Sequence, residues 1–428
     1  MPLRPGALAV LLFSMLIAGC PNSPEPEATR SPDASPAAES PGSEVSESPP
    51  QESPAREPDD PEAVAALEEL GVELSEDAAG SVVAANAYAV DLHDEDLVHF
   101  KGLPHLVDLD LGKCSITDDG LAVLEHLPQL KSLGLRRCNL ITDEGLKNLE
   151  HVPNLERLSL LFTNAGNGCM ETVASLKKLR ALDLRASKVR DAGLEQLREH
   201  PSLVDIKLRA DSITDEGVAH LTTISQLRVL EIEDAYVTSD SLPNIGSLAE
   251  LEKLNLMRTY VEAAGFEHLD RLTKLRDVRL RGAPVTPDAL VHLHGSKDSL
   301  VYLDLTECPI NDQQNLSSLV PLQNLQTLHM WQTKLADEGL EQIGQLQQLT
   351  YLNISKCPAV TSAGIDHLLG LSQLEEIVLS ETGIDDGALE KLAQLPSLKR
   401  LVIEATPAVS DEAIQAFIDA AENRTVVK

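Results

Sequence analysis

The sequence has 428 residues and a formal net charge of -33 at pH 7. This acidic balance argues against nucleic acid as a partner, because neutralising phosphates requires an excess of lysine and arginine. Aromatic residues make up only 3% of the chain. Any hydrophobic core must therefore be built from aliphatic side chains.

The first 20 residues have the anatomy of an export signal. Arg4 supplies a positive charge, and residues 7–17 form an apolar run too short to span a bilayer comfortably. The closing Ile-Ala-Gly-Cys resembles the bacterial lipobox, which implies that Cys20 is lipidated and becomes the first mature residue. Pro21 follows instead of the aspartate that favours inner-membrane retention, so we expect the outer membrane or cell surface. The alternative is an ordinary signal peptide or membrane anchor with an incidental cysteine.

Residues 21–60 are dense in Pro, Ser, Glu and Ala, with hardly an aliphatic residue besides Val45. Such a segment cannot bury enough apolar surface to offset the entropy of ordering it. Prolines and like charges also keep it extended. We therefore predict a disordered tether over residues 21–60, with a glycosylated or phosphorylated stalk as the alternative.

Residues 61–105 are predicted to form an N-terminal cap on the rest of the chain. Val64, Leu67 and Leu70 share one face of a short helix that Gly71 ends. Residues 72–74 and 81–83 could pair as a hairpin. From residue 82 the chain carries a degenerate copy of the unit that begins again at residue 106, as expected of a terminal repeat.

From residue 106 onward the chain is a repeat with a period of 24 or 25 residues. Each unit opens with L-x-x-[LIV]-x-[LIM], and we number positions within a unit from its opening leucine. A period in this range indicates a solenoid of about 13 full repeats. The opening residues are Leu106, Leu130, Leu155, Leu179, Leu203, Leu227, Leu251, Leu275, Leu300, Leu325, Leu349, Leu374 and Leu398.

Within a unit, residues 106–111 alternate as a short strand does, and residues 116–121 begin a helix. A Thr or Asp is expected to cap that helix, with acidic residues in its first turn. The last unit is followed by a helical pattern over residues 411–421, which is expected to close the stack. Strands inside and helices outside would produce a curved horseshoe.

The unit L-x-x-L-x-L-x-x-[CT]-x-[IV]-T-D-x-G-L-x-x-L resembles leucine-rich repeats of the cysteine-containing type. These repeats occur in F-box subunits of eukaryotic ubiquitin ligases and in bacterial lipoproteins of planctomycete type. The resemblance covers roughly residues 82–428 and implies an α/β horseshoe with a parallel concave sheet and convex helices. An export signal and tether stand where an F-box would precede the repeats, so no role in ubiquitin transfer is implied.

Three recurring residue types could suggest metal or redox chemistry. The cysteines at position nine (Cys114, Cys138, Cys308 and Cys357) are predicted to be buried thiols, because no C-x-x-C spacing occurs. An exported compartment would permit a disulfide between the first two, although parallel inward-pointing side chains suit it poorly. The aspartates at helix starts are predicted to be caps, with a calcium ladder as the alternative. They are Asp118, Asp143, Asp191, Asp215, Asp288, Asp337, Asp386 and Asp411.

Four histidines, His220, His268, His292 and His367, recur one residue before a helix leucine. A convex surface position explains this spacing better than a zinc site does. The chain has no G-x-S-x-G, no H-E-x-x-H and no phosphate-binding glycine loop. We therefore expect no catalytic residues, no metal and no cofactor.

Strand alternation places the third, fifth and seventh residues of each unit on the concave face, with the eighth at its edge. A first basic island comprises Arg136, Arg137, Arg157, Arg185, Lys207 and Arg209. Glu231, Glu233 and Asp234 separate it from a second island of Lys253, Arg258, Arg279 and Arg281. Tyr302, His329, Trp331 and Tyr351 then form an aromatic cluster.

The islands could recognise an acidic protein, an anionic glycan or a phosphorylated group. Alternatively, the charges pair across units, for example Asp183 with Arg209 or Lys207, and the aromatic residues pack against each other. The sequence predicts a non-enzymatic module that binds a protein or peptide ligand and is displayed on the cell envelope by a lipid anchor. The alternative is an envelope structural or carbohydrate-binding protein.

Overall fold

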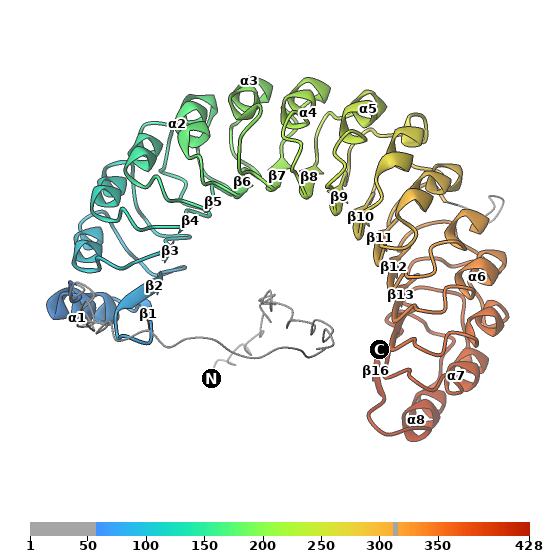
Figure 1. Cartoon of the computed structure of the whole chain (residues 1–428). Coiled ribbons are helices and arrows are strands. Elements are labelled where there is room, and N and C mark those ends of the chain that lie inside the picture. Colours follow the sequence, from blue (N-terminus) through green and yellow to red (C-terminus); the bar gives the residue numbers. More distant parts are fainter. Residues whose placement is uncertain (1–56, 311–315) are drawn as a thin grey trace, which may run out of the picture. The chain divides into compact units, whose positions relative to one another are not determined.

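The computed structural model describes residues 57–310 and 316–428. The predicted signal peptide, Cys20 and nearly all of the tether lie outside the described residues. The described residues belong to one compact unit, in which sixteen strands form a single sheet in chain order (Figure 1). β1 and β2 are antiparallel, and the later neighbours are parallel. The strands are β1 (Glu73–Glu76), β2 (Val82–Asn86), β3 (Asp108–Asp110), β4 (Ser132–Gly134), β5 (Arg157–Ser159), β6 (Ala181–Asp183), β7 (Asp205–Arg209), β8 (Val229–Glu233), β9 (Lys253–Asn255), β10 (Asp277–Arg279), β11 (Tyr302–Asp304), β12 (Thr327–His329), β13 (Tyr351–Asn353), β14 (Glu376–Val378), β15 (Arg400–Val402) and β16 (Thr425–Val427).

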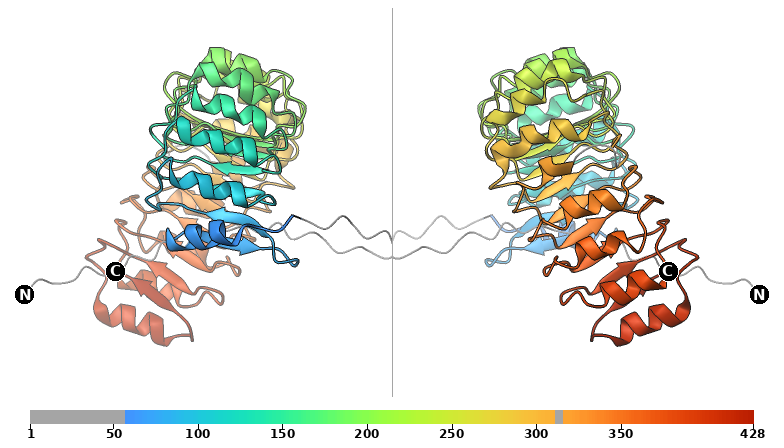
Figure 2. Two further views of the ribbon diagram at one scale, coloured as in Figure 1. Left: turned by 90° about the vertical axis from the view of Figure 1, so that its left-hand side faces the viewer. Right: turned by 90° about the vertical axis from the view of Figure 1, so that its right-hand side faces the viewer.

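The sheet lines the inside of an arc, and short helices form a layer along its outside (Figures 1 and 2). This confirms the predicted horseshoe. The α-helices are α1 (Pro61–Glu69), α2 (Met170–Ser175), α3 (Asp191–Leu194), α4 (Asp215–Leu221), α5 (Leu242–Ile245), α6 (Asp337–Ile343), α7 (Asp386–Leu392) and α8 (Asp411–Asp419). The 3₁₀ helices are η1 (Asp96–Gly102), η2 (Asp119–His126), η3 (Gly145–His151), η4 (Asn167–Cys169), η5 (Glu195–Leu197), η6 (Ser239–Ser241), η7 (Phe266–Arg271), η8 (Pro287–Ser296), η9 (Leu316–Leu319) and η10 (Gly364–Leu368).

The frequent 3₁₀ geometry follows from the length of the repeat. A unit of 24 or 25 residues leaves few residues to span the outer face. A 3₁₀ helix rises about 2.0 Å per residue against about 1.5 Å in an α-helix, so it covers more distance with fewer residues. The opening leucines and the inward residues of strands and helices together form one continuous buried core.

The aspartates at the helix starts connect successive units, which corrects their predicted role as caps. Asp191 Oδ1 accepts from the backbone N–H of Thr214 at 3.0 Å, and Oδ2 accepts from its hydroxyl at 2.7 Å. Thr214 Oγ1 in turn caps α4 by accepting from Glu216 N. The same contact from carboxylate to hydroxyl residue joins five other unit boundaries. These pairs are Asp94 with Thr117, Asp118 with Thr142, Asp215 with Thr238, Asp337 with Thr361, and Asp386 with Ser410.

The glycine of T-D-x-G is explained by the same contact. A Cβ added to Gly217 would collide with Asp191 Oδ1, and the same holds for Gly145 against Asp118. The glycine therefore makes room for the carboxylate of the preceding unit. The repeat encodes a ladder of contacts between units as well as a helix start.

Position nine satisfies backbone carbonyls inside the stack. Cys138 Sγ donates to Leu111 O of the preceding unit, whereas Thr163 Oγ1 donates to Leu160 O of its own unit. Burial raises the pKa of Cys114 to about 12 and that of Cys138 to about 11. The five cysteines among the described residues are free and buried, as predicted for structural thiols.

Both ends of the stack are closed. α1 and the β1–β2 hairpin cover the first unit, as predicted. Asp59 and Asp60, assigned to the tether by sequence, also belong to this cap: Asp59 Oδ2 accepts from Val82 N, and Asp60 caps α1. At the other end, α8 is followed by β16, which the sequence pattern did not predict. Arg424 is buried there and donates to the carbonyls of Ala393, Leu395 and Leu398.

Candidate ligand-binding face

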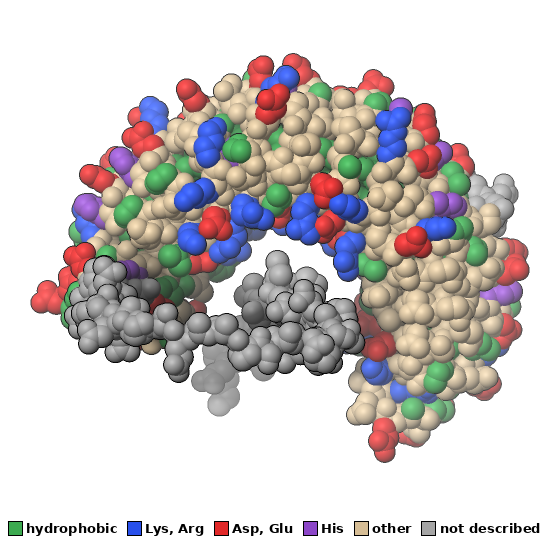
Figure 3. All heavy atoms as spheres, in the orientation of Figure 1, with side chains coloured by type: hydrophobic (Ala, Val, Ile, Leu, Met, Phe, Trp, Pro, Cys, Tyr) green, Lys and Arg blue, Asp and Glu red, His purple; other side chains and the backbone are tan. Residues whose placement is uncertain are grey.

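The concave face of the sheet is the candidate site. Lysine and arginine side chains gather on the inner side of the arc, with acidic side chains among them (Figure 3). Three zones succeed one another along the strands: a hollow over β3–β7, an ion-pair network over β6–β10, and an aromatic cluster over β11–β13.

The hollow exists because small residues form its floor. Ser132, Gly134, Ser159 and Ala181 lie on three adjacent strands and carry little or no side chain above the sheet. The hollow has a volume of about 410 Å³, and charged side chains surround the floor. The charged lining residues are Asp108, Asp110, Arg136, Arg157, Asp183, Arg185, Asp205 and Lys207.

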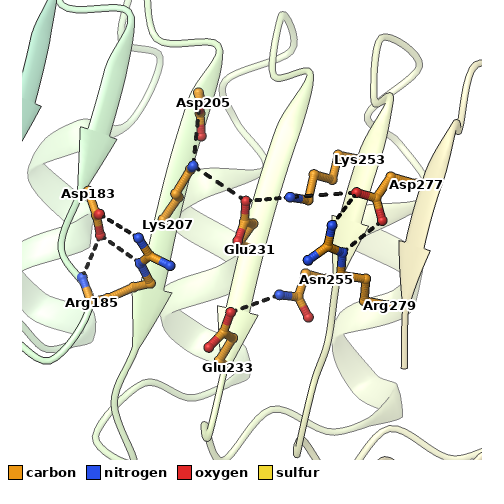
Figure 4. A network of polar contacts seen from close by, with 10 residues as sticks. All are labelled: Asp183, Arg185, Asp205, Lys207, Glu231, Glu233, Lys253, Asn255, Asp277 and Arg279. Carbon is orange, nitrogen blue, oxygen red and sulfur yellow. Dashed lines mark hydrogen bonds and ion pairs between the residues drawn. The ribbon is translucent and has the colours of Figure 1, made fainter. Parts of the chain in front are cut away.

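The ion-pair network runs across the centre of the face (Figure 4). Glu231 is its middle member, with a side chain only 6% exposed. Its carboxylate lies 2.9 Å from Lys253 Nζ and 3.6 Å from Lys207 Nζ. Lys207 also lies 4.0 Å from Asp205, and Lys253 lies 3.6 Å from Asp277.

Electrostatics keep Glu231 ionised in this network. Burial alone would raise the pKa of the Glu231 carboxyl. The hydrogen bond from Lys253 and the charges of Lys253, Lys207 and Arg185 outweigh burial, so the pKa is below its usual range. Asp205 shows the opposite balance, because burial raises its pKa more than Lys207 lowers it.

The charge pairing corrects the description of this face as two free basic islands. Arg185 makes a two-pronged pair with Asp183 of its own strand, at 2.9 and 2.8 Å, and not the predicted pair of Asp183 with Arg209 or Lys207. Asp234 bridges Arg209 and Arg258, and the hydrogen bond from Arg258 contributes most to lowering its pKa to about 2.

Among the described residues, each predicted site arginine or lysine lies within 4.0 Å of a carboxylate, and the acids between the islands connect them. The remaining pairs are Arg136 with Asp110, Arg157 with Asp108, Arg279 with Asp277, and Arg281 with Glu307.

The structure brings the predicted aromatic residues together. His329 lies between Tyr302 and Tyr351, with ring centroids 5.3 and 4.9 Å away. All three are half-buried. Burial raises the pKa of Tyr302 to about 12 and lowers that of His329, so both rings are neutral at pH 7.

Cations lie against this cluster. Arg281 and Lys356 both lie over the Trp331 ring, at 5.4 and 4.7 Å from its centroid, and Arg279 lies 4.7 Å from the Tyr302 ring. The aromatic zone therefore joins the ion-pair network through Arg279.

A second aromatic feature was not predicted from the sequence. Tyr236 and Tyr260 stack at 5.5 Å with their planes 9° apart, and each is 55% exposed. Both occupy position ten of adjacent units, at the edge of the sheet. A column reading of that position would have found them.

The described residues contain no group of three or more His, Cys, Asp or Glu side chains placed to hold a metal ion. Among the helices of the described ranges, none combines the length and apolar character that a membrane span needs. The arrangement on the concave face offers hydrogen bonds, charges and aromatic surfaces to a bound molecule.

The comparisons with known proteins agree with this fold. The family model described as Leucine Rich repeat matches residues 102–124 and 126–149. An internalin, InlF, of Listeria monocytogenes is 19% identical over 86% of this chain and 95% of that chain, with a TM-score of 0.51. A leucine-rich-repeat protein of Leptospira interrogans is 18% identical over 79% and 95% of the two chains, with a TM-score of 0.52. No curated protein is significantly similar in sequence.

Together the repeats, the open parallel sheet and these structures define the fold as a leucine-rich-repeat solenoid. Residues 102–149 carry the part of the repeat that the family model detects. The likeness to the two solved structures concerns the fold, and the concave residues of this chain must be interpreted on their own chemistry.

Proposed function

We propose that this chain is a non-enzymatic, lipid-anchored envelope protein that binds a protein or peptide ligand on its concave face. The observation that carries the proposal is the half-exposed aromatic cluster of Tyr302, His329, Trp331 and Tyr351 beside a network of oriented charges. Tryptophan, tyrosine and arginine are the residues most often found at interface hot spots. Stacked repeats also provide extended concave surfaces suited to binding.

The ion pairs prepare this face for binding. Side chains such as Arg185 and Arg279 are held by carboxylates on their own strands. A ligand therefore meets side chains that are already oriented and does not bear the entropic cost of ordering them. We expect selectivity to come from the pattern of paired charges, because like charges placed opposite each other are costly.

The lipid anchor and tether support display at the envelope. In this proposal Cys20 carries the lipid, and residues 21–56 hold the solenoid away from the membrane. Pro21 favours the outer membrane or cell surface. Metabolic labelling with palmitate tests the anchor: label should be incorporated by the wild type and lost with Cys20→Ser. Label that persists in that variant would exclude the proposed site.

Concave-face binding is tested by cross-linking residues 21–428 to envelope proteins and recovering the complexes. Arg185→Glu with Arg209→Glu should abolish capture of an acidic protein ligand, because both reversals oppose it. The matched control is Arg198→Glu with Arg271→Glu, which makes the same charge change at exposed positions on the helix side. Capture that survives the concave pair and Trp331→Ala, or that the control pair abolishes, would place binding elsewhere.

A second candidate is carbohydrate binding, which the neighbouring rings of Tyr302, His329 and Tyr351 favour. Sugar rings pack on aromatic faces, so Trp331→Ala and Tyr302→Ala should then reduce retention on envelope polysaccharide most. The charge-reversal pair would have a small effect on a neutral glycan. Loss of protein capture with polysaccharide binding unchanged assigns the face to protein.

A further inference from the structure

Three arginines surround one serine in the hollow over β3–β7. Ser159 lies at the centre of the floor, opposite Gly134 on one side and Asp183 on the other. Arg157 precedes it by two residues on the same strand. Arg136 and Arg185 stand two residues beyond its neighbours on β4 and β6, and all these residues line the same hollow.

The guanidinium groups are fixed but not exhausted. Arg136 and Arg157 each donate from Nη2, to Asp110 at 2.5 Å and to Asp108 at 3.2 Å. A guanidinium carries five N–H donors, so each arginine retains donors beyond its pair with the carboxylate. The aspartates hold the side chains in place without using their full capacity.

The serine at the centre has unused capacity as well. Ser159 Oγ is shielded from solvent and has no hydrogen-bond partner among the described residues. A buried hydroxyl without a partner is costly, and a ligand oxygen placed above the floor would satisfy it. The small floor residues leave the space that such a group needs.

We propose that this hollow is an oxyanion subsite for the peptide ligand. It takes a carboxylate side chain of that ligand, or a phosphoryl group in the same place, between Arg136, Arg157 and Arg185 with Ser159 beneath. This inference rests on the proposed function and adds the chemistry of one subsite. Arginine recognises both groups through paired N–H donors.

The lining also explains why the anion should be part of a peptide. Four basic and four acidic side chains line the hollow, so their formal charges cancel. Long-range attraction of a free anion is therefore weak, and recognition depends on hydrogen bonds made in contact. A peptide adds backbone and neighbouring contacts along the strands, which inorganic phosphate lacks.

The test uses residues 21–428 and a short fluorescein-labelled peptide of alternating Glu and Gly, followed by anisotropy at about 20 mM salt, where screening is weak. Peptides with Gln or phosphoserine in place of Glu, and inorganic phosphate as competitor, complete the set. The Glu or phosphoserine peptide should bind at least about tenfold more tightly than the Gln peptide, because charged hydrogen bonds are stronger than neutral ones. The tighter of the two identifies the natural group. Equal binding of all three peptides, or full competition by equimolar phosphate, would overturn the proposal.

Matched variants locate the site. Arg185→Gln and Arg157→Gln should each weaken the acidic peptide about tenfold, and Ser159→Leu should do so by filling the hollow. Arg279→Gln is the control, because Arg279 makes the same two-pronged pair with Asp277, at 2.9 Å, outside the hollow. It should leave binding unchanged. Thermal melts establish that all four variants fold.

Equal loss in the Arg279 and Arg185 variants would overturn the subsite. The proposed function is judged separately by capture of envelope ligands with Trp331→Ala. Capture that depends on Trp331 but not on Arg157 or Arg185 would preserve the concave binding face while rejecting the oxyanion subsite.

Discussion

The contact between Asp191 and Gly217 allows the ladder between units to be tested as a double-mutant cycle. Asp191→Ala removes two hydrogen bonds that the carboxylate accepts from Thr214, at 3.0 and 2.7 Å. Hydrogen bonds to a charged group are worth about 1.5–3 kcal/mol each when buried. Since Asp191 is only half-buried, we expect a total cost of about 2 kcal/mol.

Gly217→Ala is expected to be costly for a different reason. The added Cβ would collide with Asp191 Oδ1 and approach Asp191 Cγ to 3.1 Å. Overpacking of this kind costs about 1–3 kcal/mol. In the Asp191→Ala background the obstacle is gone, and alanine is favoured over glycine within a helix by about 1 kcal/mol. The second substitution should then be neutral or stabilising, which gives a coupling of about 2 kcal/mol or more.

Urea unfolding followed by circular dichroism measures the four free energies of the cycle. Gly387→Ala is the matched control, because the nearest atom to its Cβ is Oδ1 of Asp385 in its own unit at 3.2 Å. It should be neutral or stabilising in the wild type. Additive effects of Asp191→Ala and Gly217→Ala, with no coupling, would refute this explanation of T-D-x-G.

Three further predictions concern other features of the stack. Thiol titration of residues 21–428 with Cys20→Ser should find no fast-reacting thiol in the folded protein and five after unfolding in urea, because burial raises the thiol pKa values, for example to about 12 at Cys308; a fast-reacting native thiol would contradict this. The pKa of Asp234 is about 2 in the fold and about 4 when unfolded, so its pairs stabilise the protein above about pH 4, and this contribution is lost as the pH falls through about 2. Asp234→Asn should flatten that part of the stability curve, and an unchanged slope would refute the assignment. Ala405 has a φ of 53°, so Ala405→Gly should stabilise by about 0.5–1 kcal/mol in thermal or urea unfolding; destabilisation would show that the left-handed turn is not strained.

Much of the fold could be predicted from the sequence because the period is regular. The leucine spacing predicts strands, the inner sheet and the closing helix. The roles of the aspartates could not be obtained this way, because their partners lie in the next unit. Asp191 and Thr214 meet only once two units are stacked. Arg424 is a similar case, since a lone arginine after a helix gives no sign that it binds three carbonyls.

The candidate face was predicted in composition but not in its charge state. The alternation of a strand places residues two apart on the same side, so Asp183 and Arg185 could have been recognised as a pair. The links from Glu231 to Lys207 and Lys253 depend on the register of three strands. The hollow also depends on register, because its small residues come from three separate units.

The central claim is that the concave face binds the ligand, and site-specific photo-cross-linking tests it most directly. A photoreactive phenylalanine analogue is placed at His329 on the concave sheet or at His292 in η8 on the convex side. Each protein is expressed in the native host and irradiated. We predict a defined cross-linked partner from position 329 and none from position 292. Cross-links from position 292 alone would contradict concave-face binding.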